Sequence, residues 1–236
     1  MEAILLIVTD SLAKKAAKSQ PCISKNFKKR LNSEKKCDIL SQKTNMKGGY
    51  PMTPSASLEA YQKKIKRVLI TEEEIKDAIK SVAKKIDALY DGRPILVVCV
   101  LKGSFVFASD LCRAITVPCE IDFMRVKSYY SGTISSGNIK VVMDLDRDVS
   151  EYHVVIAEDI IDTGKTLAEL IKLLKSRNPL SLTLVSLLDK PSRREVDVHA
   201  DHNLFTIPDA FVIGYGLDCA ELYRTLPYIA EYNTEE

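Results

Sequence analysis

An alternation of apolar, β-branched runs with amphipathic helical segments constrains the fold of this 236-residue chain more than any other feature. One segment, "TEEEIKDAIKSVAKKIDALYDG", opens with a capping box at Thr71 and Glu74 and ends at Gly92. Helices are also predicted at 104–115 and 166–178, and the apolar runs between and after them are "ILVVCV", "EIDFMRV", "NIKVV", "HVVIA", "SLTLVSLL" and "AFVIGYG". This order predicts an α/β fold with a central, mostly parallel sheet flanked by helices. Ligands of such sheets bind beyond the carboxyl ends of the strands.

The stretch "VVIAEDIIDTGKT", residues 154–166, predicts a strand, an acidic turn and the start of a helix. The start of a helix presents N–H groups that have no partner within the helix, together with the positive end of the helix dipole. The turn residues therefore predict a small anion site, formed by Thr163, Gly164, Lys165 and Thr166. The final "GKT" is not the end of an ATP-binding P-loop, because that pattern requires glycine where this chain has Asp159. The loop fits one phosphate group.

Two adjacent acids, Glu158 and Asp159, precede this loop. Carboxylates can accept hydrogen bonds from vicinal hydroxyls, and they can also reach a hydrated Mg²⁺ ion. A phosphorylated sugar with a cis-diol would satisfy both the acids and the loop.

At this point a family resemblance becomes specific. The string "EDIIDTGKT" resembles the phosphoribosyl pyrophosphate (PRPP) binding loop of type I phosphoribosyltransferases, in the form found in hypoxanthine-guanine phosphoribosyltransferases. The resemblance implies the type I fold, in which a small hood formed by the N- and C-terminal segments accompanies the central sheet. It implies PRPP and a 6-oxopurine base as substrates, Mg²⁺ as cofactor, and a homodimer or homotetramer. It also implies that Asp162 acts at the purine N7 proton, either as general base or by stabilising the protonated purine.

Two further segments agree with this resemblance. In "LKGS", Lys102 and Gly103 follow a buried strand and can offer an ammonium and backbone N–H groups to pyrophosphate. The resemblance implies that the peptide between Leu101 and Lys102 is cis. The polar stretch "KSYYSGTISSGN", residues 127–138, could be a flap that excludes water, and the resemblance implies that Ser128 and Tyr129 belong to this lid.

Later motifs complete the expected site. In "LLDKP", Lys190 follows a buried strand, where its ammonium can donate to a purine 6-oxo group. In "FVIGYGLDCAELYR", Phe211 can stack on the purine and the main chain of Val212 can meet its edge. From the same motif Asp218 would join Glu158 and Asp159 as a Mg²⁺ ligand. Arg224 would reach the pyrophosphate.

The beginning of the chain has a different composition. Residues 1–50 contain 11 Lys and Arg against 4 Asp and Glu, whereas the remainder contains 23 against 28. No sustained helical or strand period is present there, and the breaker-rich "NMKGGYPMTPSAS" follows. We therefore expect a basic, disordered extension over residues 1–56 and a phosphoribosyltransferase domain over residues 57–236, with regular structure beginning near Ile65.

Composition also limits the cellular setting. The sequence has no apolar run of eighteen residues, and the apolar stretch in "MEAILLIVTD" is too short for a signal peptide. Six cysteines are scattered without CxxC spacing, which favours reduced thiols and a cytoplasmic protein.

These motifs predict a purine salvage enzyme that transfers the phosphoribosyl group of PRPP to hypoxanthine or guanine, giving IMP or GMP and pyrophosphate. One alternative is a PRPP-binding nucleic-acid regulator on the same fold that uses the basic N-terminal residues. The presence of Asp162, Lys190, Phe211 and Asp218 together favours the enzyme over a protein with a nucleic-acid partner. A phosphoribosyltransferase that prefers xanthine remains a second alternative, because xanthine also carries a 6-oxo group.

Overall fold

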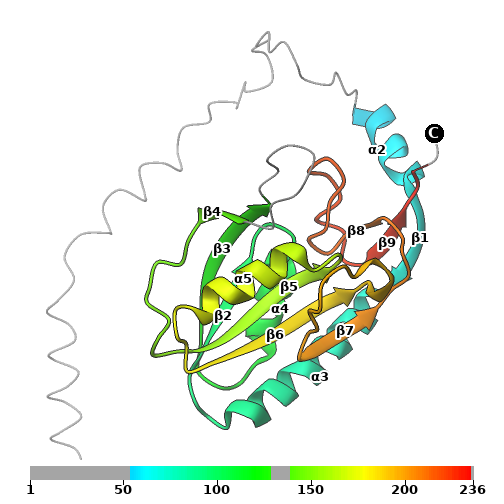
Figure 1. Cartoon of the computed structure of the whole chain (residues 1–236). Coiled ribbons are helices and arrows are strands. Elements are labelled where there is room, and N and C mark those ends of the chain that lie inside the picture. Colours follow the sequence, from blue (N-terminus) through cyan, green and yellow to red (C-terminus); the bar gives the residue numbers. More distant parts are fainter. Residues whose placement is uncertain (1–53, 129–138, 235–236) are drawn as a thin grey trace, which may run out of the picture. The chain divides into compact units, whose positions relative to one another are not determined.

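The computed structural model describes residues 54–128 and 139–234 (Figure 1). Residues 1–53, most of the expected lid including Tyr129, and the last two residues lie outside the described part. The helices are α2 (Pro54–Lys63), α3 (Glu72–Tyr90), α4 (Phe105–Ala114), α5 (Lys165–Lys175) and the 3-10 helix η1 (Pro191–Arg193). The strands are β1 (Ile65–Ile70), β2 (Ile95–Val100), β3 (Cys119–Ser128), β4 (Ile139–Met143), β5 (His153–Ile161), β6 (Ser181–Asp189), β7 (His202–Thr206), β8 (Val212–Ile213) and β9 (Ile229–Tyr232).

Six strands form the central sheet, in the order β4-β3-β2-β5-β6-β7. Only the pairing of β3 with β4 is antiparallel, and the other four pairings are parallel. All six residues of β2, "ILVVCV", are buried, which explains why this run lacks the alternation of a half-exposed strand. The mostly parallel sheet predicted from the sequence is confirmed.

Helices cover both faces of this sheet (Figure 1). Helices α3 and α4 pack on one face, in a core cluster that includes Ile75, Ile86 and Phe107. Helix α5 packs on the other face through Leu170 and Leu174. The predicted capping box of α3 is present, because the Thr71 N–H donates to the Glu74 carboxylate and the Glu74 N–H donates to the Thr71 hydroxyl.

A second, three-stranded sheet has the order β1-β9-β8 and is antiparallel throughout. It joins strands from the beginning and the end of the described chain, as expected for the hood. The run "AFVIGYG" was expected to be a strand alongside the others, but only Val212–Ile213 is a strand, and it belongs to this small sheet. The chain turns directly afterwards at Gly214, which has φ +96°, and an added Cβ there would lie 2.1 Å from the carbonyl oxygen of Tyr228.

Five elements were not predicted individually: helix α2, the 3-10 helix η1, and the strands β1, β7 and β9. Strand β7 lies in a stretch that was interpreted as a polar loop, and as the edge strand of the sheet it is only partly buried. Helix α2 comes before Ile65, where regular structure was expected to begin. Among the described residues, no helix combines the length and the apolar character needed to cross a membrane.

Candidate active site

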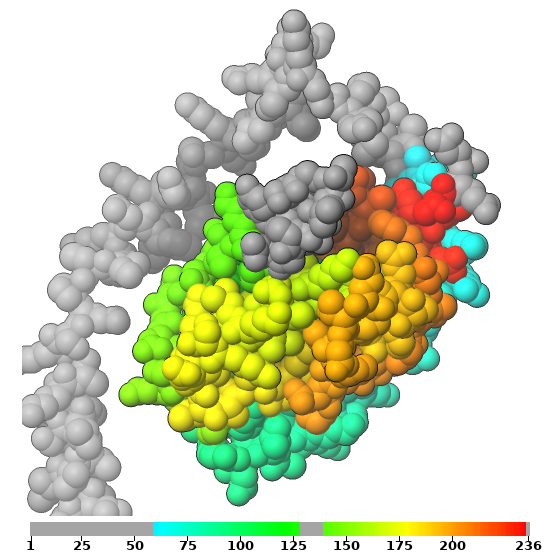
Figure 2. All heavy atoms as spheres, in the orientation of Figure 1, coloured from blue at the N-terminus to red at the C-terminus, as the bar shows by residue number. Residues whose placement is uncertain are grey.

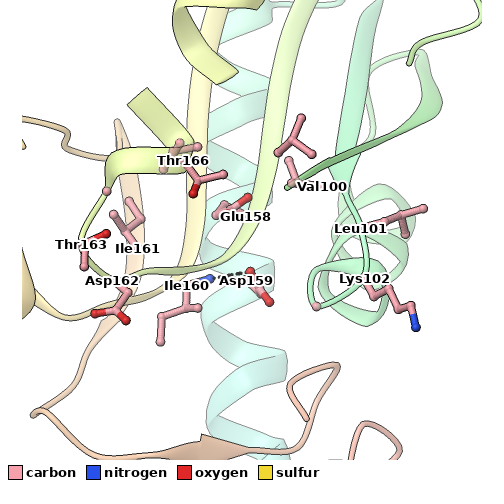
Figure 3. A pocket seen from close by; sticks show the side chains of 14 residues that line it. Val100, Leu101, Lys102, Glu158, Asp159, Ile160, Ile161, Asp162, Thr163 and Thr166 are labelled. Atoms are coloured by element: carbon pink, nitrogen blue, oxygen red, sulfur yellow. Dashed lines mark hydrogen bonds between the residues drawn. The ribbon is translucent and has the colours of Figure 1, made fainter. Parts of the chain in front are cut away.

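A pocket of about 280 Å³ lies beyond the carboxyl ends of β2 and β5, where a ligand site was expected (Figure 3). Its wall is formed by residues 100–103 after β2 and by residues 158–164 of β5 and the following loop, together with Val126, Thr166 and Leu167. Because β2 and β5 are parallel neighbours, their ends bring two loops from distant parts of the sequence together.

The loop after β5 has the geometry of an anion site. Gly164 has φ +81° and caps α5, and the space beside it is occupied, since an added Cβ would lie 3.1 Å from Val196 Cγ2. Both constraints favour glycine at this position. Thr163, Gly164 and Thr166 line the pocket. Lys165 does not, because its ammonium pairs with the carboxylate of Glu195.

The loop after β2 closes the other side of the pocket. The peptide between Leu101 and Lys102 is cis, as the family resemblance implied. A Cβ on Gly103 would lie 1.4 Å from Asp159 Oδ2, so only glycine lets this loop approach β5 so closely. The Lys102 ammonium donates to Glu221 Oε2 at 2.8 Å.

Glu158 and Asp159 lie within strand β5 and not in a turn, because the strand continues to Ile161. Their side chains therefore leave opposite faces of the strand, as Figure 3 shows. Burial raises the pKa of Asp159 to about 6. Burial and the neighbouring Asp159 raise the pKa of Glu158 well above its usual value, and Glu158 Oε2 is buried without a hydrogen-bond partner. This pair needs hydroxyl donors or a cation.

Asp218 and Arg224 form a second charged group with Glu221. Arg224 Nη2 lies 2.9 Å from Asp218 Oδ1 and 3.0 Å from Glu221 Oε2, and Nη1 donates to the carbonyl of Gly216 at 2.8 Å. This segment packs on the loop after β2, since a Cβ on Gly216 would lie 2.0 Å from the carbonyl oxygen of Gly103. Lys102 and Arg224 thus share one carboxylate, that of Glu221, which was not singled out in the sequence.

The carboxylates expected to hold Mg²⁺ do not form a ready-made cage. In the described part of the chain, no group of three or more acidic, His or Cys side chains is close enough to hold a metal ion by itself. The donor set still fits the ion, because carboxylate oxygens are hard ligands and Glu158 has an unused oxygen. Mg²⁺ usually keeps several waters and takes further oxygens from substrate phosphates.

The residues expected to bind the base lie next to this pocket and do not line it. Lys190 is only 8% exposed, and its ammonium donates to the carbonyl oxygen of Ala210 at 2.6 Å. That contact brings it to the residue before Phe211, whose ring is 48% exposed and meets Tyr232 edge-on at 5.5 Å. The backbone N–H of Lys190 donates to the carbonyl of Ile161, which connects the residues expected to bind the base with those that line the pocket. Val212 is buried in β8.

Asp162 lines the pocket and also contacts the segment that follows Lys190. Its Oδ1 accepts from Arg193 Nε at 3.0 Å, and both side chains are nearly half exposed. Arg193 was not singled out in the sequence, although "KPSRRE" contains two adjacent arginines after Lys190. Of the two expected lid residues, Ser128 ends β3, and Tyr129 lies outside the described residues.

Comparisons with known proteins agree with this arrangement. The family model of the phosphoribosyl transferase domain matches residues 69–220, and the chain belongs to this family. Within the family it is similar to proteins that act on a purine base. A hypoxanthine phosphoribosyltransferase of Buchnera aphidicola is 46% identical over 167 residues, which is 70% of this chain and 94% of the relative.

A longer bifunctional protein and a solved structure are also similar to this chain. A bifunctional TilS/HprT protein of Listeria innocua is 48% identical over 171 residues, which is 72% of this chain but only 26% of that longer protein. The crystal structure of a hypoxanthine phosphoribosyltransferase from Staphylococcus aureus superposes with a TM-score of 0.71 and 44% identity, covering 74% of this chain and 95% of that one.

Proposed function

We propose that the protein is a purine salvage enzyme that transfers the 5-phosphoribosyl group from PRPP to hypoxanthine or guanine, forming IMP or GMP and pyrophosphate. One observation carries the proposal. The buried carboxylates Glu158 and Asp159, the first of which has an oxygen without a hydrogen-bond partner, stand between two loops suited to anions, at residues 163–166 and 101–103. A ribose with phosphate groups at both ends would meet all three features at once.

Each substrate group then has a protein partner. The ribose hydroxyls donate to Glu158 and Asp159, and the 5-phosphate accepts from the N–H groups of residues 163–166. The ammonium of Lys165 would reach the same phosphate after leaving the carboxylate of Glu195. The pyrophosphate lies at Lys102, Gly103 and Arg224. Lys102 and Arg224 both bind the carboxylate of Glu221 in the ligand-free protein, and pyrophosphate would displace that carboxylate from them.

The base is held on the side of Lys190. Its buried ammonium donates to the 6-oxo group, Phe211 stacks on the ring, and the main chain of Val212 meets the purine edge. Adenine lacks the 6-oxo acceptor, so the site favours 6-oxopurines. A base pocket of this kind has no use in a PRPP-binding regulator, which supports the enzyme.

Chemistry at C1′ replaces pyrophosphate by the purine nitrogen through a transition state that carries positive charge on the ribose. The negative charge of Glu158 and Asp159 beside the ring stabilises that charge. Asp162, within the same loop, takes or shares the N7 proton. Glu158, Asp159 and Asp218 would hold Mg²⁺, which supplies positive charge beside the departing pyrophosphate when bound.

The direct test is a spectrophotometric assay with PRPP and Mg²⁺ and each of hypoxanthine, guanine, xanthine and adenine. We expect turnover of hypoxanthine and guanine. Absence of turnover with all four bases, in a protein shown to be folded, would refute the proposal, and a clear preference for xanthine would correct the substrate.

The role of Asp162 has its own test. Replacing Asp162 by Asn keeps the shape of the side chain but removes its ability to accept a proton. We expect kcat to fall roughly 10²–10⁴-fold, the usual range for a general acid or base, with nearly unchanged PRPP affinity. An unaltered kcat under conditions in which chemistry limits turnover would remove Asp162 from the mechanism.

We also propose that the protein is a homodimer or homotetramer and that it is cytoplasmic. Support for the assembly comes from the edge of the sheet, where the apolar side chains of Ile121, Phe123 and Val142 are 38–45% exposed on β3 and its antiparallel partner β4. A second copy of the chain would cover this surface. The free thiols of Cys112 and Cys119 support a reducing compartment.

A further inference from the structure

Residues 193–196, which begin at the last residue of η1, run beside the phosphate loop at residues 162–165. Two carbonyls of the loop accept hydrogen bonds from these residues. Arg194 Nη1 donates to the carbonyl of Asp162 at 2.5 Å, and the backbone N–H of Glu195 donates to the carbonyl of Thr163 at 3.0 Å. These contacts lie beyond the last paired residues of β5 and β6, Ile161 and Asp189. In the space-filling view, the orange surface that follows β6 adjoins the yellow surface of α5 (Figure 2).

These contacts fix the direction of two peptide groups. In a planar trans peptide the N–H points opposite to the C=O, and both peptides concerned are trans. The carbonyl of Asp162 shares its peptide with the N–H of Thr163, and the carbonyl of Thr163 shares its peptide with the N–H of Gly164. Both carbonyls face residues 194–195, so both N–H groups face away from them. The described residues supply no hydrogen bond for these two N–H groups, which belong to residues that line the pocket.

Arg194 is the side chain that holds this arrangement. It is 12% exposed, and its guanidinium also pairs with the carboxylate of Asp189 at the end of β6. It therefore bridges the end of one strand to the loop that follows its neighbour. Its stem fills the space beside the loop, since a Cβ on Gly164 would lie 3.3 Å from Arg194 Cδ.

We propose that Arg194 is a positioning residue for the phosphate site. By holding the carbonyl of Asp162 outward, it keeps the N–H of Thr163 turned toward the phosphate. Without it the peptide could turn over, and a carbonyl oxygen with partial negative charge would then face the anion. The inference rests on the proposed function, because it takes the bound anion to be the 5-phosphate of a nucleotide product or of PRPP.

The experiment compares IMP with inosine, which lacks only the 5-phosphate. Affinities are measured by competition or calorimetry for wild type, Arg194→Gln and Arg194→Lys. We expect Arg194→Gln to weaken IMP binding roughly ten- to hundredfold, the range for losing hydrogen bonds that involve charge, while inosine affinity changes less than about threefold. Arg194→Lys should fall between, because an ammonium lacks the planar fork that reaches both oxygens.

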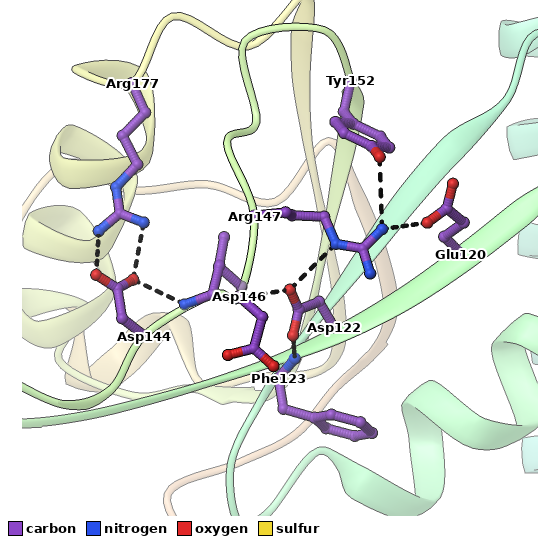
Figure 4. A network of polar contacts seen from close by, with 9 residues as sticks. Glu120, Asp122, Phe123, Asp144, Asp146, Arg147, Tyr152 and Arg177 are labelled. Carbon is purple, nitrogen blue, oxygen red and sulfur yellow. Dashed lines mark hydrogen bonds and ion pairs between the residues drawn. The ribbon is translucent and has the colours of Figure 1, made fainter.

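Arg177 provides a matched control. It is 24% exposed and binds Asp144 in a two-pronged ion pair at 2.7 and 2.8 Å (Figure 4), at the end of α5 opposite the phosphate loop. Arg177→Gln should lower the melting temperature and leave the ratio of IMP to inosine affinity unchanged.

If Arg194→Gln lowers the melting temperature but keeps the wild-type ratio of IMP to inosine affinity, the proposal is overturned and Arg194 is only a structural residue. If Arg194→Gln does not fold, the same comparison is decided with Arg194→Lys. The wild-type turnover assay judges the proposed function separately. Should hypoxanthine prove not to be a substrate, the affinity of inorganic phosphate for wild type and variants still tests Arg194.

Discussion

At the scale of single residues, Lys190 is the side chain whose surroundings depart most from those of an ordinary lysine. A lysine at the end of a strand is usually exposed, yet this one is 8% exposed and donates to a carbonyl oxygen one residue before Phe211. Burial of an ammonium requires acceptors, and a 6-oxo group arriving above Phe211 would provide a second one.

We expect Lys190→Ala to lower kcat/KM for hypoxanthine and guanine roughly ten- to hundredfold, because a hydrogen bond that involves charge is worth about 1.5–3 kcal/mol. Discrimination against adenine should narrow, since the variant removes a donor that opposes the 6-amino group. PRPP affinity, measured separately, should hardly change. Unaltered ratios among the three bases would show that Lys190 does not contact the purine.

The carboxyl pair gives a pH dependence. Burial raises the pKa of Asp159 to about 6, against an unfolded value near 3.8, so the folded protein binds the extra proton between these pH values. The contribution of Asp159 to the stability of the ligand-free protein should therefore fall as pH rises from about 4 to about 6 and then level off.

Replacing Asp159 by Asn removes the loss of stability that ionisation of this buried carboxyl causes. We expect the variant to be more stable than wild type above pH 6, on the order of 2 kcal/mol, and equal to it below pH 4, in urea titrations without ligand. Asp144→Asn is the opposite control. Its ion pair with Arg177 lowers the pKa of Asp144, so that variant should lose stability near neutral pH and converge with wild type in acid. A destabilised Asp159→Asn protein at pH 7 would contradict the interpretation.

Several partners of the site residues were out of reach of the sequence. Glu195 and Glu221 hold Lys165 and Lys102, and Arg193 holds Asp162. Motif spacing predicts which residues meet a substrate, because the substrate imposes that spacing. The residues that replace the substrate as counter-ions come from η1 and from the segments that follow η1 and β8, and only the tertiary structure brings them close.

At the scale of elements, the amphipathic helices and the buried parallel strands were predictable because each has a strong period or a long apolar run. Strand β7 was not, since an edge strand with a partly exposed face carries neither signal. The end of the strand in "AFVIGYG" at Ile213 was also missed. It depends on the close approach of Gly214 to Tyr228, a residue far along the chain that the pattern of the run itself cannot reveal.

The beginning of the chain can be tested by two truncations. A chain that starts at Ser57 keeps Tyr61, whose ring stacks on Tyr223 with centroids 4.0 Å apart, and we expect wild-type melting temperature and turnover. A chain that starts at Ile65 loses this stack, worth about 0.5–1.5 kcal/mol, and should melt several degrees lower. Loss of folding in the first truncation would contradict the proposed boundary at residue 57.

At the scale of the whole molecule, the exposed apolar edge of the sheet bears on assembly. Light scattering should give a mass of two or four times 26.4 kDa. Phe123→Lys places a charge on the surface formed by Ile121, Phe123 and Val142, and should lower that mass because burying an unpaired ammonium is costly. Lys127→Glu, an exposed change four residues further along the same strand, is the control. A monomeric wild type would refute the proposed assembly.

The strand order has a consequence for the growing chain. The pocket needs both β2 and β5, which are neighbours in the sheet although two other strands lie between them in the sequence. Contacts of this long range form late and slow the folding of a domain. A ribosome-bound chain that has emerged only as far as β4 therefore has no half-formed pocket to offer a nucleotide. Recognition of substrate begins only when the second half of the sheet has been synthesised and has docked beside the first.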